Sequence, residues 1–151
     1  MMRKFTLFIL LTLTIAAGSC QEEKICSNMI IPGAECTDMY LPLLAGKKVG
    51  LVINQSSVIK KVSLLDSLLS LGINVNVIFS PEHGFSGSGD PGEHIDDMDE
   101  RKSGIRIISL YGKKRKPAKE DISGLDVLVF DIQDVGVRFY TYISTLHYVM
   151  E

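Results

Sequence analysis

The sequence predicts an α/β protein with a Rossmann-like, mainly parallel sheet and helices on both of its faces. Four short runs are apolar throughout rather than alternating with polar residues, which is typical of strands buried on both faces. Apolar residues at helical spacing separate the first two runs, and alternating strands and helices indicate a parallel sheet. With 46% apolar residues in 151, the chain can fill one core.

The first predicted strand covers residues 49–53 and ends at Asn54 and Gln55. Apolar residues then recur at helical spacing, at Val58, Val62, Leu65 and Leu69. This spacing predicts a helix that stops before Gly72, a residue typical of a helix C-terminus.

The second predicted strand covers residues 75–79, and a long glycine-rich loop follows it. Residues 105–110 and 127–130 are the third and fourth strands, and the connection over 113–125 holds at most a short helix. One face of a closing helix is expected to carry Phe139, Tyr142 or Ile143, Leu146, and Val149 or Met150. The sequence stops within this pattern, which favours a partial chain.

The first twenty residues predict a lipoprotein signal peptide. A basic start over 1–4 precedes an apolar run over 5–17, and small residues then lead to Cys20. The run is too short for a permanent membrane helix. Small residues followed by cysteine match a lipobox, in which Cys20 receives the lipid; the alternative is an ordinary signal peptide with a nearby cysteine. We expect an exported, membrane-anchored lipoprotein of the cell envelope, on its periplasmic face or outer surface.

The predicted organisation has three parts: a signal peptide over 1–20, a tether and lead-in segment over 21–45, and a Rossmann-like domain over 46–151. Cys26 and Cys36 fall in the tether, where an exported protein could pair them as a disulfide. The net charge of −2 gives no reason to expect a nucleic acid partner.

Polar residues follow each predicted strand, where parallel sheets place their ligands. These rim residues are Asn54, Gln55, Glu82, His83, Tyr111, Asp131, Gln133, Asp134 and Arg138. Tyr140, near the start of the closing helix, could stack on a sugar. The basic run over 113–116 is expected to be a solvated turn, although it could hold an anionic group of a substrate.

The loop after the second strand is the candidate catalytic site. Its residues 80–85 read SPEHGF, with Pro81 stiffening the exit from the strand. Glu82 and Glu93 could be a carboxylate pair for glycoside hydrolysis. Alternatively, a metal could bind the loop through Glu82, His83, Asp90 and His94. The spacing matches no strong metal motif, so we expect no metal. No Gly-x-Gly-x-x-Gly follows the first strand, so we expect no dinucleotide and no other cofactor.

Several segments resemble the exo-β-N-acetylmuramidase (NamZ-like) family. They are residues 49–55, 79–85, 92–93, 109–112 and 126–145. The most specific stretches read VFDIQDVG over 129–136 and RFYTY over 138–142. The resemblance extends over residues 33–151, in the order and spacing of the family.

The resemblance implies an enzyme that releases terminal β-linked N-acetylmuramic acid from peptidoglycan fragments. Family members place the site between a Rossmann-like N-terminal domain and a smaller C-terminal domain, and we expect the latter to be absent from this chain. The family's proposed catalytic glutamate falls on Glu82. His83, Glu93 and residues 131–138 would line the same cleft. Asn54, Tyr111 and Tyr140 complete the substrate-binding residues that we expect.

The mechanism expected from these residues has two carboxylates. Glu82, with a raised pKa, would protonate the leaving oxygen, and Glu93 or Asp131 would activate water or stabilise the oxocarbenium-like centre. Their separation would decide whether the anomeric configuration is retained or inverted. The alternatives are a surface lipoprotein that binds glycan without cleaving it, and an inactive fragment.

Overall fold

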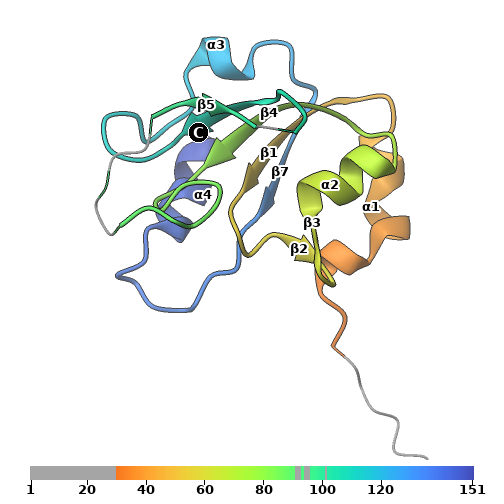
Figure 1. Cartoon of the computed structure of the whole chain (residues 1–151), viewed down its shortest axis with the longest axis horizontal. Helices are drawn as coiled ribbons and strands as arrows, with labels where there is room; N and C mark the ends of the chain where they lie inside the picture. Colours follow the sequence, from red (N-terminus) through yellow and green to blue (C-terminus); the bar gives the residue numbers. More distant parts are fainter. Residues whose placement is uncertain (1–29, 91–92, 94–95, 101) are drawn as a thin grey trace, which may run out of the picture. The chain divides into compact units, whose positions relative to one another are not determined.

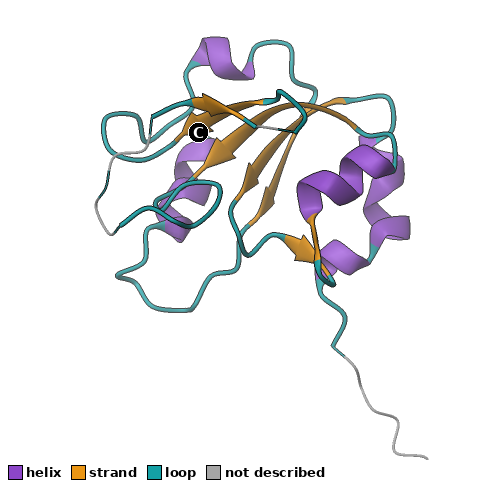
Figure 2. Cartoon of the chain, viewed as in Figure 1, coloured by secondary structure: helices purple, strands orange, loops and turns teal. Residues whose placement is uncertain are grey.

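The computed structural model describes residues 30–90, 93, 96–100 and 102–151, without the Asp99 side chain. Residues from Ile31 to Glu151 form one compact unit, an α/β fold with helices on both faces of a sheet (Figures 1 and 2). The predictions for the signal peptide, Cys20 and Cys26 lie outside the described residues. Among those described, no helix is both long and apolar enough to cross a bilayer.

The sheet has five strands in the order β5-β6-β4-β1-β7. Four consecutive strands of this sheet run parallel to one another: β1 (Lys48–Ile53), β4 (Asn74–Ser80), β6 (Arg106–Ser109) and β7 (Val127–Asp131). The short β5 (Met98–Asp99) pairs antiparallel with β6. The prediction of a mainly parallel sheet is therefore confirmed, and the apolar runs are the strands because helices cover both of their faces.

Alternate side chains of each strand enter two separate cores. On one face, Leu51 packs in a buried cluster with α1 (Thr37–Leu44) and α2 (Leu64–Ser70). On the other face, Val52 and Phe79 pack against Val149 of α4 (Tyr142–Met150). A strand's side chains alternate between faces, so a polar residue at a strand end is directed to one face only.

The helix predicted from Val58 onward begins later than expected. Val58 and Val62 lie in a small hairpin made of β2 (Val58–Ile59) and β3 (Val62–Ser63). Helix α2 begins at Leu64, where the Ser63 hydroxyl accepts a hydrogen bond from the backbone N–H of Asp66 at 3.0 Å. The four-residue spacing of the valines matched a helix by coincidence, whereas the cap at Ser63 sets where the helix starts.

Helix α1 lies in the segment predicted as a tether, after the short 3-10 helix η1 (Gly33–Glu35). Leu44 is buried in the core, with Tyr40 and Leu41 packed beside it. Pro42 lies inside this helix, and because proline is disfavoured in helix interiors the sequence did not indicate a helix here. The compact unit therefore starts at Ile31, earlier than the predicted position 46. Cys36 lies between η1 and α1.

The closing helix and the short connecting helix are both present. α3 (Lys119–Ile122) is the short helix expected between the third and fourth strands. In α4, Tyr142 is buried and Val149 packs on the core, whereas Ile143 and Met150 are exposed. Phe139 precedes the helix and is 85% exposed, so its predicted place on one face of this helix is wrong.

Candidate functional site

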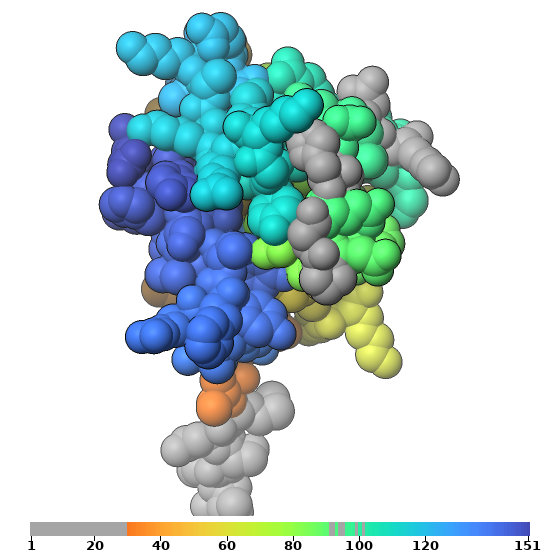
Figure 3. Space-filling model, turned by 90° about the vertical axis from the view of Figure 1, so that its left-hand side faces the viewer, coloured from red at the N-terminus to blue at the C-terminus, as the bar shows by residue number. Residues whose placement is uncertain are grey.

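The carboxyl ends of the parallel strands open onto one side of the molecule. Three segments are exposed side by side on this face: the segment after β4 in green, the segment after β6 in cyan, and the C-terminal segment with α4 in blue (Figure 3). Side chains from segments distant in sequence therefore meet at this rim, which is where parallel sheets bind ligands.

Glu82 stands at the centre of this rim, two residues beyond the end of β4. The Thr141 hydroxyl, just before α4, donates a hydrogen bond to Glu82 Oε2 at 2.9 Å. Tyr111, after β6, donates its hydroxyl to the same carboxylate, and this bond raises the pKa of Tyr111. Sequence reasoning missed Thr141, because a hydroxyl before a helix usually caps the helix instead.

Asn54 and Tyr142 form a second polar pair beside Glu82. Asn54 is 3% exposed at the end of β1, and its amide donates to the Tyr142 hydroxyl. Burial raises the pKa of Tyr142, the Asn54 bond opposes this rise, and the Glu82 charge adds to it. Asn54 Oδ1 also accepts from the Ser56 backbone and hydroxyl at 2.9 and 2.6 Å. The amide is therefore held in one orientation toward α4.

Ser56 and Ser57 join the turn after β1 to the segment after β7. The backbone N–H of Gln133 donates to the Ser56 hydroxyl at 3.1 Å. The Ser57 hydroxyl donates to the backbone carbonyl of Asp131. These bonds place Gln133 at the rim beside Asn54.

Two pockets border the start of α4. One, of about 210 Å³, is lined by Tyr111, Arg115, Thr141, Ser144, Thr145 and Tyr148 among others. The other, of about 250 Å³, is lined by Asn54, Gln55, Gln133, Tyr140 and Tyr142 among others. Both hydroxyl partners of Glu82 line the first pocket, and Tyr142, which senses the Glu82 charge, lines the second. Glu82 therefore lies close to residues that line each of the two pockets.

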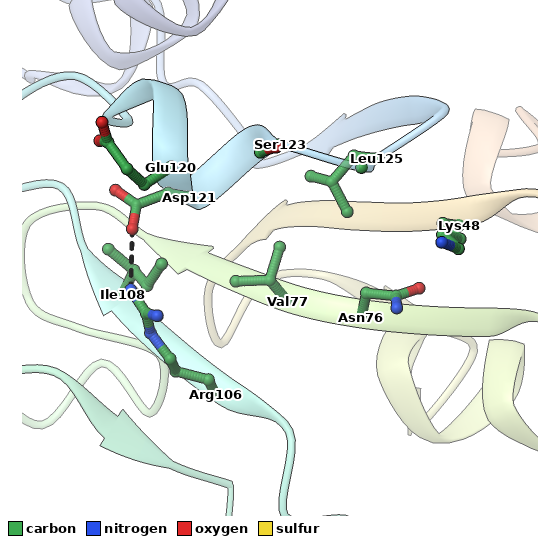
Figure 4. Close-up of a pocket in the computed structure, with 10 residues that line it drawn as sticks. Lys48, Asn76, Val77, Arg106, Ile108, Glu120, Asp121, Ser123 and Leu125 are labelled. Carbon is green, nitrogen blue, oxygen red and sulfur yellow. Dashed lines mark hydrogen bonds and ion pairs between the residues drawn. The ribbon is translucent and has the colours of Figure 1, made fainter.

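A further pocket lies beneath α3, at the amino ends of the strands (Figure 4). Lys48 and Arg106 in its lining are the first residues of β1 and β6. Asp121 forms ion pairs at 2.7 Å with both Arg106 and Lys114. This pocket is at the wrong end of the sheet for a ligand crevice, and its charges already neutralise one another.

Asp131 is directed away from Glu82. It pairs with Ile53, which belongs to the core under α1 and α2, so its side chain faces that side. Its charge also contributes to the raised pKa of Tyr40 on α1, where burial is the larger cause. Burial raises the pKa of Asp131 itself, and its Oδ2 has no hydrogen-bond partner among the described residues.

Glu93 and His83, the two other loop residues predicted for the site, form hydrogen bonds within the loop. Glu93 is exposed and its Oε2 accepts from the Asp90 backbone N–H at 2.7 Å. His83 has a φ of 70°, rare for a residue other than glycine, and its Nδ1–H donates to the Gly89 carbonyl at 2.9 Å. These bonds close the loop into a compact turn directly after Glu82.

The remaining predicted residues lie on the exposed segment between β7 and α4. Asp134 accepts from the neighbouring Val135 N–H at 2.8 Å, and the Arg138 guanidinium lies 5.8 Å from the Phe139 ring centroid. Tyr140 lines the second pocket, with its ring edge-on to Tyr142 at a centroid distance of 6.1 Å. Among the described residues, no three His, Cys, Asp or Glu side chains are grouped to hold a metal ion.

Comparison with known proteins gives consistent matches. The family model described as "Exo-beta-N-acetylmuramidase NamZ, N-terminal" matches residues 49–151. The chain is 42% identical over 116 residues to the peptidoglycan beta-N-acetylmuramidase NamZ of Bacillus subtilis (strain 168), covering 74% of this chain and 28% of that protein.

Two crystal structures of DUF1343 family proteins from Bacteroides fragilis NCTC 9343 also match. The first is 39% identical with a TM-score of 0.67, over 80% of this chain and 30% of that one. The second is 37% identical with a TM-score of 0.64, over 74% of this chain and 28% of that one. The chain therefore spans less than a third of the length of these relatives.

Proposed function

The chain belongs to the family of the exo-beta-N-acetylmuramidase NamZ N-terminal domain, and from this membership we propose that it is the Glu82-bearing part of a peptidoglycan glycosidase. The Bacillus subtilis relative is, by its name, a peptidoglycan beta-N-acetylmuramidase. The specific reaction that we propose is exo-acting: release of terminal β-linked N-acetylmuramic acid from peptidoglycan fragments during cell-wall turnover or recycling.

The observation that carries this proposal is the position of Glu82 beside residues that line two neighbouring pockets. Two hydroxyls, from Tyr111 and Thr141, orient its carboxyl group. A carboxylic acid placed between two sugar subsites can protonate the oxygen that joins them, which is the first step of glycoside hydrolysis. Small pockets that each hold one unit also suit an enzyme that removes a terminal sugar.

Glu93 is the second carboxylate that we propose, in preference to Asp131. Glu93 is exposed and lies on the same loop as Glu82, so water has access to it. Asp131 faces the core beneath α1 and α2 instead. In this mechanism Glu82 donates the proton and Glu93 activates water or stabilises the positive charge at the anomeric carbon.

Export to the cell envelope is also part of the proposal. It is supported by the basic start, the short apolar run and Cys20 in the sequence. It agrees with the proposed substrate, because peptidoglycan lies outside the cytoplasm. The lipid on Cys20 would hold the enzyme at a membrane that faces its substrate.

The test is release of 4-nitrophenol from 4-nitrophenyl β-N-acetylmuramic acid by the complete product of the gene. On the disaccharide of N-acetylmuramic acid β-linked to N-acetylglucosamine, whose leaving oxygen must be protonated, we expect Glu82→Gln to lower kcat by about 100-fold or more, as for loss of a general acid. Glu120→Gln is the matched control, because Glu120 is an exposed glutamate of α3, and it should leave turnover unchanged.

Two results would count against the proposal. Binding of the glycoside without release of nitrophenol by the wild-type protein would indicate a glycan-binding protein rather than an enzyme. Unchanged turnover in Glu82→Gln, with an unchanged circular dichroism spectrum, would remove Glu82 from the mechanism.

A further inference from the structure

The basic run over 113–116 contains one cation that lines a pocket of the site. Lys114 is paired with Asp121 at 2.7 Å, and Lys116 is paired with Glu151 at 3.0 Å. Arg115 instead lines the pocket of about 210 Å³ beside Glu82. In the part of the chain that the structure describes, no carboxylate forms an ion pair with Arg115. Its guanidinium is therefore available to a ligand.

The rest of this pocket suits a sugar. Hydroxyl groups come from Thr141, Ser144 and Thr145, and aromatic rings come from Tyr111 and Tyr148. Hydroxyls exchange hydrogen bonds with sugar hydroxyls, and tyrosine rings offer flat apolar faces. The lining contains no Asp or Glu, so its formal charge is positive.

Tyr111 connects this pocket to the catalytic carboxylate. Its hydrogen bond to Glu82 raises its pKa, while the charge of Arg115 acts in the opposite direction. The Tyr111 hydroxyl is thus within electrostatic reach of both groups. A ligand that fills the pocket and contacts Arg115 therefore lies directly beside Glu82.

The second pocket differs from this one in charge. Its lining includes the amides of Asn54, Gln55 and Gln133 and the rings of Tyr140 and Tyr142, with no charged side chain. Amides bind neutral polar groups, whereas guanidinium binds carboxylates through two parallel hydrogen bonds. The two pockets near Glu82 thus favour different sugars.

We propose that the pocket containing Arg115 is the subsite for the acidic sugar, and that Arg115 binds the lactyl carboxylate of a muramic acid unit. This inference rests on the proposed function and adds the residue that distinguishes muramic acid from N-acetylglucosamine, which lacks the lactyl group. The planar guanidinium can bind both oxygens of a carboxylate at once, which makes arginine better suited than lysine to this role. Arg115 is in this role a determinant of specificity.

The experiment is a calorimetric titration of the complete gene product with free N-acetylmuramic acid and with its uncharged methyl ester. We expect the wild-type protein to bind the acid about tenfold more tightly than the ester, as for a charged hydrogen bond. Arg115→Gln should lower affinity for the acid to that for the ester and leave the ester unaffected. Arg115→Lys, which keeps the charge without the fork, should give an intermediate affinity.

Lys113→Gln is the matched control. It also removes one positive charge, but Lys113 lies two residues before Arg115 in the sequence and its side chain does not line the pocket. It should preserve the preference for the acid. Equal binding of acid and ester by the wild-type protein, binding of neither, or a preference that survives Arg115→Gln would overturn the subsite. So would an equal loss in Lys113→Gln, which would indicate general attraction of anions. Release of nitrophenol by the wild-type protein tests the glycosidase separately.

Discussion

Two carboxylates at the carboxyl ends of strands β4 and β7 have opposite surroundings. Glu82 accepts hydrogen bonds from two hydroxyls at the rim. Asp131 ends β7 with its Oδ2 buried and without a partner among the described residues. A buried carboxylate that lacks hydrogen bonds destabilises the folded state when it is charged, so the two acids make opposite contributions at neutral pH.

Replacing Asp131 by asparagine should therefore stabilise the protein at neutral pH. Burial raises its folded-state pKa above the ordinary value of 3.8, so the folded state holds the proton more tightly than the unfolded state. Stability then falls as pH rises through the raised pKa and stays lower above it. We expect Asp131→Asn to raise the free energy of unfolding at about pH 7 by on the order of 1 kcal/mol.

Urea denaturation across the acid range measures this effect. The advantage of Asp131→Asn should shrink as pH falls and vanish below the ordinary pKa of 3.8, where both states of the wild type are protonated. Asp134→Asn is the control, since Asp134 is exposed, and it should change stability little at any pH. An advantage independent of pH would show that the charge of Asp131 is not the cause.

At the level of elements, the loop after β4 owes its shape to close packing as well as to hydrogen bonds. Gly87 has a φ of 67°, and a Cβ at this position would lie 2.3 Å from the Gln55 side chain. Gln55 belongs to the turn after β1 and lines the second pocket. The glycine therefore allows two segments of the rim to approach closely.

Gly87→Ala should reduce the free energy of unfolding by about 2–3 kcal/mol, from backbone strain plus displacement of the exposed Gln55 side chain. Gly104→Ala separates the two effects, because Gly104 has a φ of 70° with open space around its Cβ position. It should cost only about 1–2 kcal/mol. If urea denaturation gave equal losses of unfolding free energy in the two variants, the close contact with Gln55 would add no cost to the substitution at Gly87.

At the scale of the whole molecule, the proposal joins an exported anchor to a folded domain. The compact unit starts at Ile31, eleven residues after Cys20 in the sequence. A lipid on Cys20 would tether that unit to a membrane through a short segment. Under this proposal, a single cysteine would decide whether the protein is attached to the membrane or released from it.

Cys20→Ala should move the protein from the membrane fraction to the soluble fraction of the cell envelope. It should also remove the mass of the lipid from the mature protein, which mass spectrometry measures directly. Cys26→Ala removes a cysteine of the same segment and should leave attachment intact. A Cys20→Ala protein that stays in the membrane with unchanged mass would contradict the proposed anchor.

The family and the strands were predictable from the sequence because both depend on local patterns. Predominantly apolar runs such as residues 49–53 and 75–79 are strands in the structure, since a sheet covered on both faces buries nearly all of their side chains. The resemblance over 126–145 is confirmed by the family model. The spacing after the first strand was misleading, because a four-residue period fits both a helix and two strands of a hairpin.

Glu82 and the rim were identified from the sequence by itself, because the ends of parallel strands always meet at one edge. Tertiary structure alone decided what surrounds them. Thr141 bonds Glu82 across 59 positions of sequence, and long-range pairing of this kind leaves no local pattern. The face on which Asp131 lies depends on its register with Ile53, where a shift of one residue reverses the direction of the side chain. Arg115 differs from Lys114 and Lys116 because Asp121 and Glu151 pair with those two lysines in space, whereas Arg115 lines a pocket.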